Sequence, residues 1–167
     1  METVVIARNQ KPHRNTFIAT ALGTVVLLVM FFFTYSSSVP GLETSMVMYG
    51  IMAPVALVGA IISGRALQNK SPALELTNEG LVDNISLVKP GLIRWQHIHS
   101  TKLKKVQGQE LLVVYLHSDG AELDLPSRAA QLRAASMLKK VDSPIAIPVK
   151  FVELEGEALK ALIDGRL

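Results

Sequence analysis

Two long apolar stretches that contain no charged residue dominate the N-terminal part of the chain. They run from Thr16 to Tyr35 and from Met46 to Ser63. A helix needs about 20 apolar residues to cross the hydrocarbon core of a bilayer, and a charged side chain at that depth costs about 2.5–3.5 kcal/mol. The pattern therefore predicts two transmembrane helices, over about 16–35 and 46–63, that form a hairpin within residues 16–64.

The residues around this hairpin predict its orientation. Its connection contains Pro40-Gly41, which is typical of a tight turn, and has no Lys or Arg. Basic residues flank the hairpin, so the positive-inside rule places both termini in the cytoplasm. These basic residues are Arg8, Lys11, Arg14, Arg65 and Lys70. We expect a multi-pass inner-membrane protein with a cytoplasmic N-terminal segment over residues 1–15. A cleaved signal peptide is the alternative, but its apolar region would be only about 7–15 residues long.

Small residues recur along both predicted helices and let helix backbones approach closely in lipid. They include Gly23 in the first helix and Gly50, Gly59 and Gly64 in the second. We expect these residues to pack the two helices on each other, and the same faces could also support a homo-oligomer. Neither stretch contains an acidic, basic or histidine residue, which argues against transport, because a transport path normally needs one inside the membrane.

Residues 71–167 begin with alternating apolar and polar positions, which predicts antiparallel strands separated by turns. We expect strands over about 73–77, 80–87, 92–98, 101–110, 111–117 and 121–125, with a mobile loop around Gly108. The run from Leu111 to His117 is almost continuously apolar, which is typical of a central strand. Ser118-Asp119-Gly120 predicts a hairpin turn before the strand over 121–125.

The pattern changes to helical spacing after Pro126. Residues 127–141 are rich in Ala, Leu, Arg and Lys, with Ser127 as the expected N-cap and Pro144 beyond the end. An extended segment over 144–152 and a C-terminal helix with an apolar stripe from Leu154 to Ile163 follow. The domain over 71–167 is therefore predicted to be α+β, with a small antiparallel sheet or barrel whose open end a helix covers.

The composition supports this interpretation and excludes several chemistries. Hydrophobic residues make up 49% of the chain and the mean hydropathy is +0.33, which excludes a disordered protein. The absence of cysteine excludes disulfides, thiol catalysis and thiolate metal sites. From Ser71 onward 12 Lys and Arg balance 12 Asp and Glu. A neutral domain is a poor binder of nucleic acid, because phosphate contacts need clustered positive charge.

Short motifs in this domain resemble those of a known family. They are the Glu79-Gly80 turn, Asp83-Asn84, the Gly91-x-Ile93-x-Trp95 strand followed by Ile98, and Pro144-Ile145. Together with the two preceding helices, they make the chain resemble a family of uncharacterised bacterial inner-membrane proteins that carry a C-terminal domain like a bacterial pleckstrin-homology (PH) domain. The resemblance implies a PH-like barrel closed by the C-terminal helix, and it brings no catalytic residues.

Two features of the domain suggest a contact with lipid or with a partner. Lys102, Lys104 and Lys105 form a basic segment that could attract anionic headgroups. Lysines also protect the exposed edges of sheets, which is the alternative role for this segment. Trp95, the single tryptophan, is expected in the core or at the end of the barrel, with a ligand or membrane contact as the alternative.

The remaining candidates for chemistry are histidines. His97 and His99 would face the same side of a strand, as two metal ligands can. No carboxylate at ligand spacing accompanies them, so we expect ordinary polar residues and no metal site. The sequence has no GxSxG, P-loop or GxGxxG motif, and we expect neither catalysis nor a cofactor.

These features predict a non-enzymatic inner-membrane protein that presents a PH-like binding module to the cytoplasm. The expected partners are the lipid bilayer and a protein, and not nucleic acid. The alternative function is that of an immunity or protective protein, which would block a membrane-acting toxin through its helices.

Overall fold

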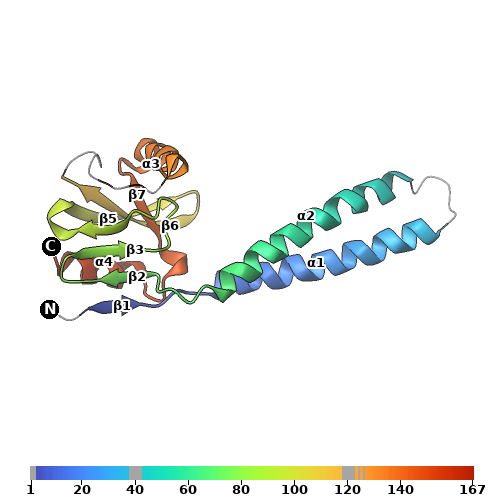
Figure 1. Ribbon diagram of the computed structural model, residues 1–167, viewed down its shortest axis with the longest axis horizontal. Coiled ribbons are helices and arrows are strands. Elements are labelled where there is room, and N and C mark those ends of the chain that lie inside the picture. Colours follow the sequence, from blue (N-terminus) through green and yellow to red (C-terminus); the bar gives the residue numbers. More distant parts are fainter. Residues whose placement is uncertain (1–2, 38–42, 118–122, 124, 126) are drawn as a thin grey trace. The chain divides into compact units, whose positions relative to one another are not determined.

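The computed structural model describes residues 3–37, 43–117, 123, 125 and 127–167, and the chain divides into two units (Figure 1). One unit covers residues 10–70 and contains α1 (Lys11–Ser36) and α2 (Glu43–Gln68). The other unit combines the residues up to Asn9 with those from Ser71 onward, and we call it the domain. Both predicted apolar helices are confirmed as helices, and each extends several residues further than its apolar stretch. The predicted turn at Pro40-Gly41 lies outside the described residues.

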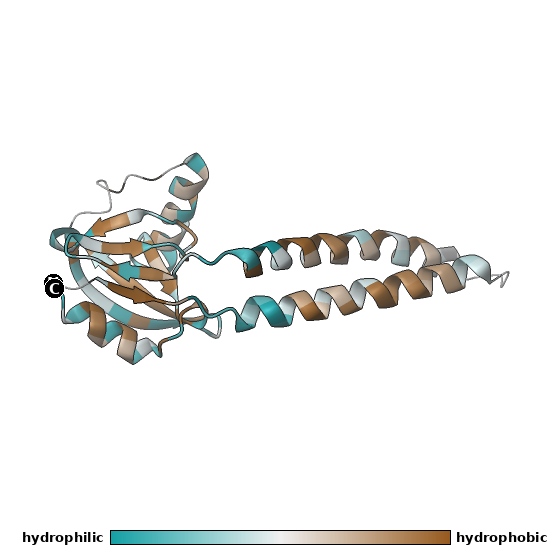
Figure 2. Ribbon diagram, turned by 60° about the horizontal axis from the view of Figure 1, so that its bottom comes forward, coloured by the Kyte–Doolittle hydropathy of each residue, from teal (hydrophilic) through white to brown (hydrophobic). Residues whose placement is uncertain are grey.

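Within their own unit, α1 and α2 lie side by side and are hydrophobic along most of their length (Figure 2). Only 6% and 11% of their most apolar windows are buried within the structure. Phe33 is 66% exposed and Val55 is 68% exposed. Close approach uses small residues, because a Cβ atom added at Gly59 would lie 3.4 Å from the Thr20 side chain. Each helix has 26 residues, which gives a length of about 39 Å, more than the roughly 30 Å of a hydrocarbon core. By length and composition, both helices can cross a membrane.

The domain contains two antiparallel sheets, each with its strands in chain order. The first sheet consists of β1 (Val4–Ile6), β2 (Leu74–Leu76), β3 (Gly80–Asp83) and β4 (Gly91–Arg94). The second consists of β5 (Ile98–Val106), β6 (Gln109–Leu116) and β7 (Ile145–Pro148). The helices are α3 (Arg128–Val141) and α4 (Gly156–Asp164), and the short 3-10 turns are η1 (Trp95–His97) and η2 (Val149–Phe151). The predicted α+β class is confirmed, but among the described residues the strands do not close into a barrel.

Strand β1 was not predicted, and it connects the N-terminal segment to the domain. Val4 pairs with Leu76 and Ile6 pairs with Leu74, and the Ala73 N–H donates to the Ile6 carbonyl at 2.9 Å. The residues that follow β1 continue against the segment after β7, with an isolated bridge between Arg8 and Val152. The helical pair is therefore inserted between two neighbouring strands of one sheet, and the first residues are not a separate segment.

Two strands of the first sheet are shorter than expected. The strand predicted over 80–87 ends at Asp83, because the Asp83 Oδ1 accepts the N–H groups of Ile85 and Ser86 and turns the chain. The strand predicted over 92–98 ends at Arg94, and Trp95–His97 forms the turn η1 instead. Alternation alone could not locate these ends, because the side-chain and tertiary hydrogen bonds that end the strands are not part of the apolar pattern.

The second sheet confirms the predicted central strand, because β6 lies between β5 and β7. Its continuous apolar run serves two cores: Leu112 and Val114 face the first sheet and α4, while Leu111 and Val113 face the smaller core on the α3 side. The hairpin from β5 to β6 turns at Gln107 and Gly108, which have φ of 51° and 76°. Two positive φ angles are typical of a tight type I′ turn, so the expected mobile loop is a compact turn. The predicted turn at 118–120 and most of the strand over 121–125 lie outside the described residues.

Both helices predicted in the domain are confirmed. α3 begins after Ser127, whose hydroxyl accepts the Ala130 N–H at 3.2 Å as an N-cap. α4 packs Leu159 and Ile163, both fully buried, against the main core between the two sheets. The main core therefore lies between the two sheets, and the C-terminal helix α4 covers it.

Candidate functional site

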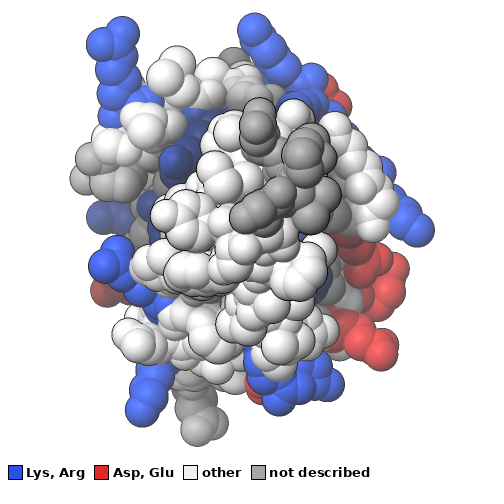
Figure 3. All heavy atoms as spheres, turned by 90° about the vertical axis from the view of Figure 1, so that its right-hand side faces the viewer, with Lys and Arg blue, Asp and Glu red and all other residues white. Residues whose placement is uncertain are grey.

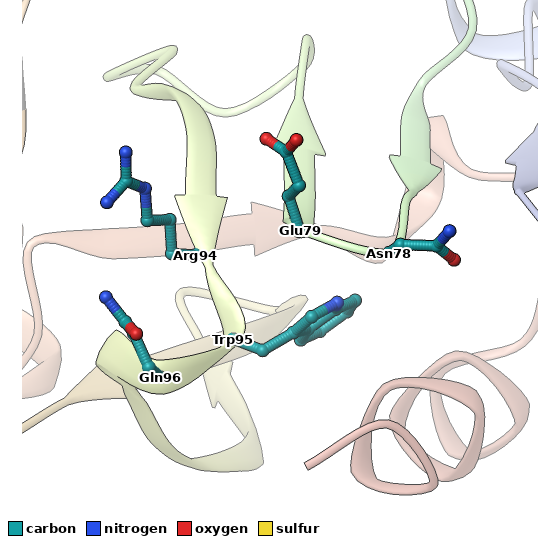
Figure 4. Close-up of a pocket in the computed structure, with 5 residues that line it drawn as sticks. All are labelled: Asn78, Glu79, Arg94, Trp95 and Gln96. Carbon is teal, nitrogen blue, oxygen red and sulfur yellow. The ribbon is translucent and has the colours of Figure 1, made fainter. Parts of the chain in front are cut away.

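An open pocket of about 480 Å³ lies where β2 turns into β3 and where β4 ends (Figure 4). Its lining residues are Asn78, Glu79, Arg94, Trp95 and Gln96. The Glu79 and Arg94 side chains both point upward in the view of Figure 4, and the Trp95 ring lies below Asn78. The pocket therefore combines one acidic group, one basic group, two amides and an aromatic ring. Such a set can hydrogen-bond a polar segment of another molecule, and it contains no nucleophile.

The Trp95 side chain is fixed by hydrogen bonds and by packing. Its indole Nε1–H donates to the Thr77 carbonyl at 2.9 Å, and its backbone N–H donates to the Glu79 carbonyl at 3.2 Å. The ring is half-buried and packs against the main core. Both roles expected for Trp95 are therefore compatible with its position, because one part of the ring packs inward and the residue also lines the pocket.

The turn beside Trp95 is held by Thr77 and by the close approach of two strands. The Thr77 Oγ1 accepts the N–H groups of Glu79 at 3.3 Å and Gly80 at 3.1 Å. A Cβ atom at Gly80 would lie 2.1 Å from the Ile93 carbonyl oxygen. Only glycine allows this approach, so β3 and β4 present the pocket residues on a rigid frame.

The predicted basic segment does not form one patch. Lys102 and Lys104 lie on one face of β5, where their Nζ atoms are 5.7 and 5.6 Å from the centre of the Tyr115 ring. Lys105 alternates to the other face of the strand. The Lys104 Nζ donates to the Val141 carbonyl at 2.9 Å, at the C-terminal end of α3 where a cation is favourable.

Lys104 has a further set of contacts that assign it a structural role. A hydrogen bond with Tyr115, and a weaker one with Asp142, raise the pKa of Lys104 above its ordinary value. Its Nζ is 3.3 Å from the Asp142 Oδ2. Of the three lysines, Lys104 is therefore engaged within the domain, and Lys102 and Lys105 are the exposed members.

The histidines separate in the structure. His97 lies in η1, with its Nε2 3.3 Å from the Gln96 Nε2, and His99 lies at a bulge in β5. The His99 ring contacts the His117 ring, with 5.1 Å between ring centres. His97 and His99 do not share a strand face, because β5 begins only at Ile98. Among the described residues, no three His, Asp or Glu side chains are placed to hold a metal ion.

Asp83, which belongs to the Asp83-Asn84 motif of the family resemblance, has a buried carboxyl group that the sequence pattern does not predict. The residue is 1% exposed, and burial raises the pKa of its carboxyl above the ordinary value of 3.8, while hydrogen bonds from Ser86 and Ile85 oppose this shift. The Asp83-x-x-Ser86 spacing at the end of a strand was the available signal. The carboxyl organises the loop from Asn84 to Pro90.

Comparison with known proteins identifies no relative, since no family model, no curated protein and no solved structure matches this chain. Function is therefore inferred from the residues and topology of the chain itself.

Proposed function

We propose that this protein is a membrane-anchored binding protein, in which α1 and α2 span a bacterial inner membrane and the domain binds a protein partner in the cytoplasm without catalysis. One observation carries the proposal. The two apolar helices are inserted between β1 and β2, which are neighbouring strands of one sheet. The domain is formed by the segments before and after the hairpin in the chain, so two connections hold it at the membrane.

Two features support a cytoplasmic location for the domain and for both termini. Because β1 pairs directly with β2, both ends of the hairpin emerge on the side of the membrane where the domain folds. The residues on that side include Arg8, Lys11, Arg14, Arg65 and Lys70. An excess of Lys and Arg beside the spans is typical of the cytoplasmic side.

Two features of the domain support the PH-like fold that the resemblance implies. Its antiparallel sheets enclose one main core, and the C-terminal helix α4 packs against that core. It departs from a closed barrel, because β4 and β5 belong to different sheets and are joined by η1.

The pocket lined by Trp95 and Arg94 supports a protein as the partner. Tryptophan and arginine are enriched in the energetically important parts of protein interfaces. The pocket is at the end of β2, whereas the connection to α2 enters at the start of β2. The end of the domain away from the membrane connections is therefore the one that presents this pocket.

Thiol labelling tests the anchor and its orientation, because the natural chain has no cysteine. A membrane-impermeant maleimide should label Thr44→Cys in intact spheroplasts, and should label Leu167→Cys only after the membrane is opened. Extraction of membranes with carbonate should leave the protein in the pellet. Labelling of Leu167→Cys from outside would reverse the topology, and release by carbonate would refute the anchor.

Photo-crosslinking tests the binding role. A photoreactive amino acid at Gln96 should form one discrete adduct in membranes, while the same amino acid at Glu157, on the exposed face of α4, should not. The adduct should disappear when Arg94→Glu reverses one charge of the pocket. Equal crosslinking at both positions, or no effect of Arg94→Glu, would show that the pocket does not hold the partner.

A further inference from the structure

One edge of the domain contains both points at which the chain leaves for the helices. We call it the connection edge, and its residues are 7–9, 71–73, 84–90 and 149–152. Side chains hold these segments together: the Arg8 Nη2 donates to the Asn84 carbonyl at 3.2 Å, and the Asn84 Nδ2 donates to the Pro72 carbonyl at 3.3 Å. The Asn9 Nδ2 donates to the Lys150 carbonyl at 3.0 Å. The edge is therefore one continuous, hydrogen-bonded surface.

Basic charge exceeds acidic charge at the connection edge. Its charged residues are Arg8, Lys89 and Lys150, and one acidic residue, Glu153, adjoins it, with its N–H donated to the Ala7 carbonyl at 3.2 Å. From Ser71 onward, by contrast, the chain has equal numbers of acidic and basic residues. Lys89 and Lys150 are exposed. The connection edge is thus positive, although the domain as a whole is neutral. Figure 3 shows Lys and Arg side chains spread around the outline of the molecule, with the larger group of Asp and Glu side chains at the right of the view.

The loop from Asn84 to Pro90 presents an apolar side chain at this edge. Leu87 is 53% exposed, although its neighbours Ser86 and Val88 are 1% and 2% exposed. The loop is fixed, because the Lys89 N–H donates to the Ser86 Oγ at 3.0 Å and Arg133 of α3 donates to the Leu87 carbonyl at 3.2 Å. Lys89 has a φ of 48°, an unusual conformation for a residue other than glycine. A rigid loop thus holds Leu87 and Lys89 next to each other at the surface.

Chain length keeps this edge close to the helix ends. Only Gln10 separates Asn9 from the first residue of α1, and only three residues separate Gln68, the last residue of α2, from Pro72. Such connections reach at most about 15 Å, whatever the orientation of the domain. The cytoplasmic leaflet carries a negative potential that acts on basic groups near its surface.

We propose that the connection edge binds the anionic headgroups of the bilayer that the helices span, with Lys89 and Lys150 at the phosphates and Leu87 inserted among the headgroups. This inference rests on the proposed membrane anchor. It assigns lipid contact to a surface other than the segment Lys102–Lys105. It also fixes the orientation of the domain, since a docked edge directs the pocket at Trp95 away from the membrane.

Site-directed spin labelling of the full chain in lipid nanodiscs tests the proposal. Leu87→Cys reports on the edge, and Leu167→Cys is a matched control, because Leu167 is 51% exposed and lies at the C-terminus, at the opposite end of the domain (Figure 1). A third label, Val26→Cys in α1, reports separately on whether the helices lie in the bilayer. Each protein is compared in discs of phosphatidylcholine alone and in discs that also contain phosphatidylglycerol.

In discs with phosphatidylglycerol, the label at position 87 should be more accessible to oxygen than to a water-soluble nickel reagent, and the label at position 167 should not. Lys89→Ala with Lys150→Ala should lower the ratio of docked to undocked domain about 30-fold. Lys102→Ala with Lys105→Ala removes the same net charge at two exposed lysines of β5, outside the connection edge, and should leave the ratio unchanged.

Three results would overturn the proposal. If the label at position 87 reports water in both lipid compositions while the label at position 26 reports lipid, the anchor stands and the edge does not bind headgroups. If both double variants lower the docked fraction equally, net charge and not this edge controls the interaction. A label at position 26 that reports water would refute the anchor itself, and the headgroup contact with it.

Discussion

Replacing Ile6 with alanine tests whether the strand before the helices is part of the folded domain. The Ile6 side chain is 4% exposed and lies in the main core. Truncating a buried isoleucine to alanine costs about 2–5 kcal/mol, a large share of the roughly 5–15 kcal/mol that stabilises a typical domain. Val5, its neighbour in β1, is 61% exposed, so Val5→Ala should change the free energy of unfolding by less than about 0.5 kcal/mol.

The measurement uses a soluble form in which a linker replaces residues 10–70. About ten Gly and Ser residues reach up to about 33 Å. This is ample, because the Ala73 N–H already lies 2.9 Å from the Ile6 carbonyl oxygen. Urea unfolding followed by the fluorescence of Trp95, the single tryptophan, then reports the free energy of unfolding of the domain. Circular dichroism provides an independent signal for the same transition.

The fragment 71–167 without β1 extends this test. We expect it to be destabilised at least as much as Ile6→Ala, because it loses the Ile6 side chain and the hydrogen bonds that Ile6, Ala7 and Asn9 make with the rest of the domain. If Ile6→Ala and Val5→Ala have equal effects, or if the fragment is as stable as the linked form, β1 does not complete the core. Residues 71–167 would then fold independently, as the sequence pattern alone predicts.

Three further substitutions test individual contacts in the linked form. Burial raises the pKa of Asp83 in the folded state. The protonated carboxyl therefore contributes stability that is fully present below about pH 4 and is lost as the pH rises through the raised pKa. Asp83→Asn should remove this pH-dependent loss of stability, and urea midpoints measured from pH 4 to 7 would reveal the difference. If the substitution leaves the pH profile of stability unchanged, Asp83 does not ionise in this range. Trp95→Phe should lower the free energy of unfolding by about 0.5–1.5 kcal/mol through loss of the hydrogen bond to Thr77, measured by circular dichroism; no loss would mean that this bond contributes nothing. Gly80→Ala should prevent folding, because its Cβ would lie 2.1 Å from the Ile93 carbonyl oxygen. The control Gly108→Ala meets no atom within 4 Å, but Gly108 has a φ of 76°, so this substitution should cost only about 1–2 kcal/mol. A folded Gly80→Ala protein in the same circular dichroism assay would contradict the close approach of the two strands.

The sequence by itself determined the elements that local properties control. The two apolar helices follow from length and from the absence of charge, and α3 follows from helical spacing and the Ser127 cap. The central position of β6 follows from a run that is apolar on both faces of the strand, which only a strand covered on both sides requires. In each case the signal lies within a few turns or one strand of the chain.

Tertiary structure alone decided which distant residues meet. β1 has only three residues, too few for a readable alternation, and its partner β2 begins at Leu74, beyond the entire helical hairpin. The pocket combines the turn at Asn78 with the end of β4. Lys104 contacts the end of α3, so its role differs from that of its neighbour Lys105. Hydrogen bonds between segments far apart in the chain leave no periodic pattern in either segment. The domain boundary, the pocket and the basic connection edge therefore become visible only when the strands are paired.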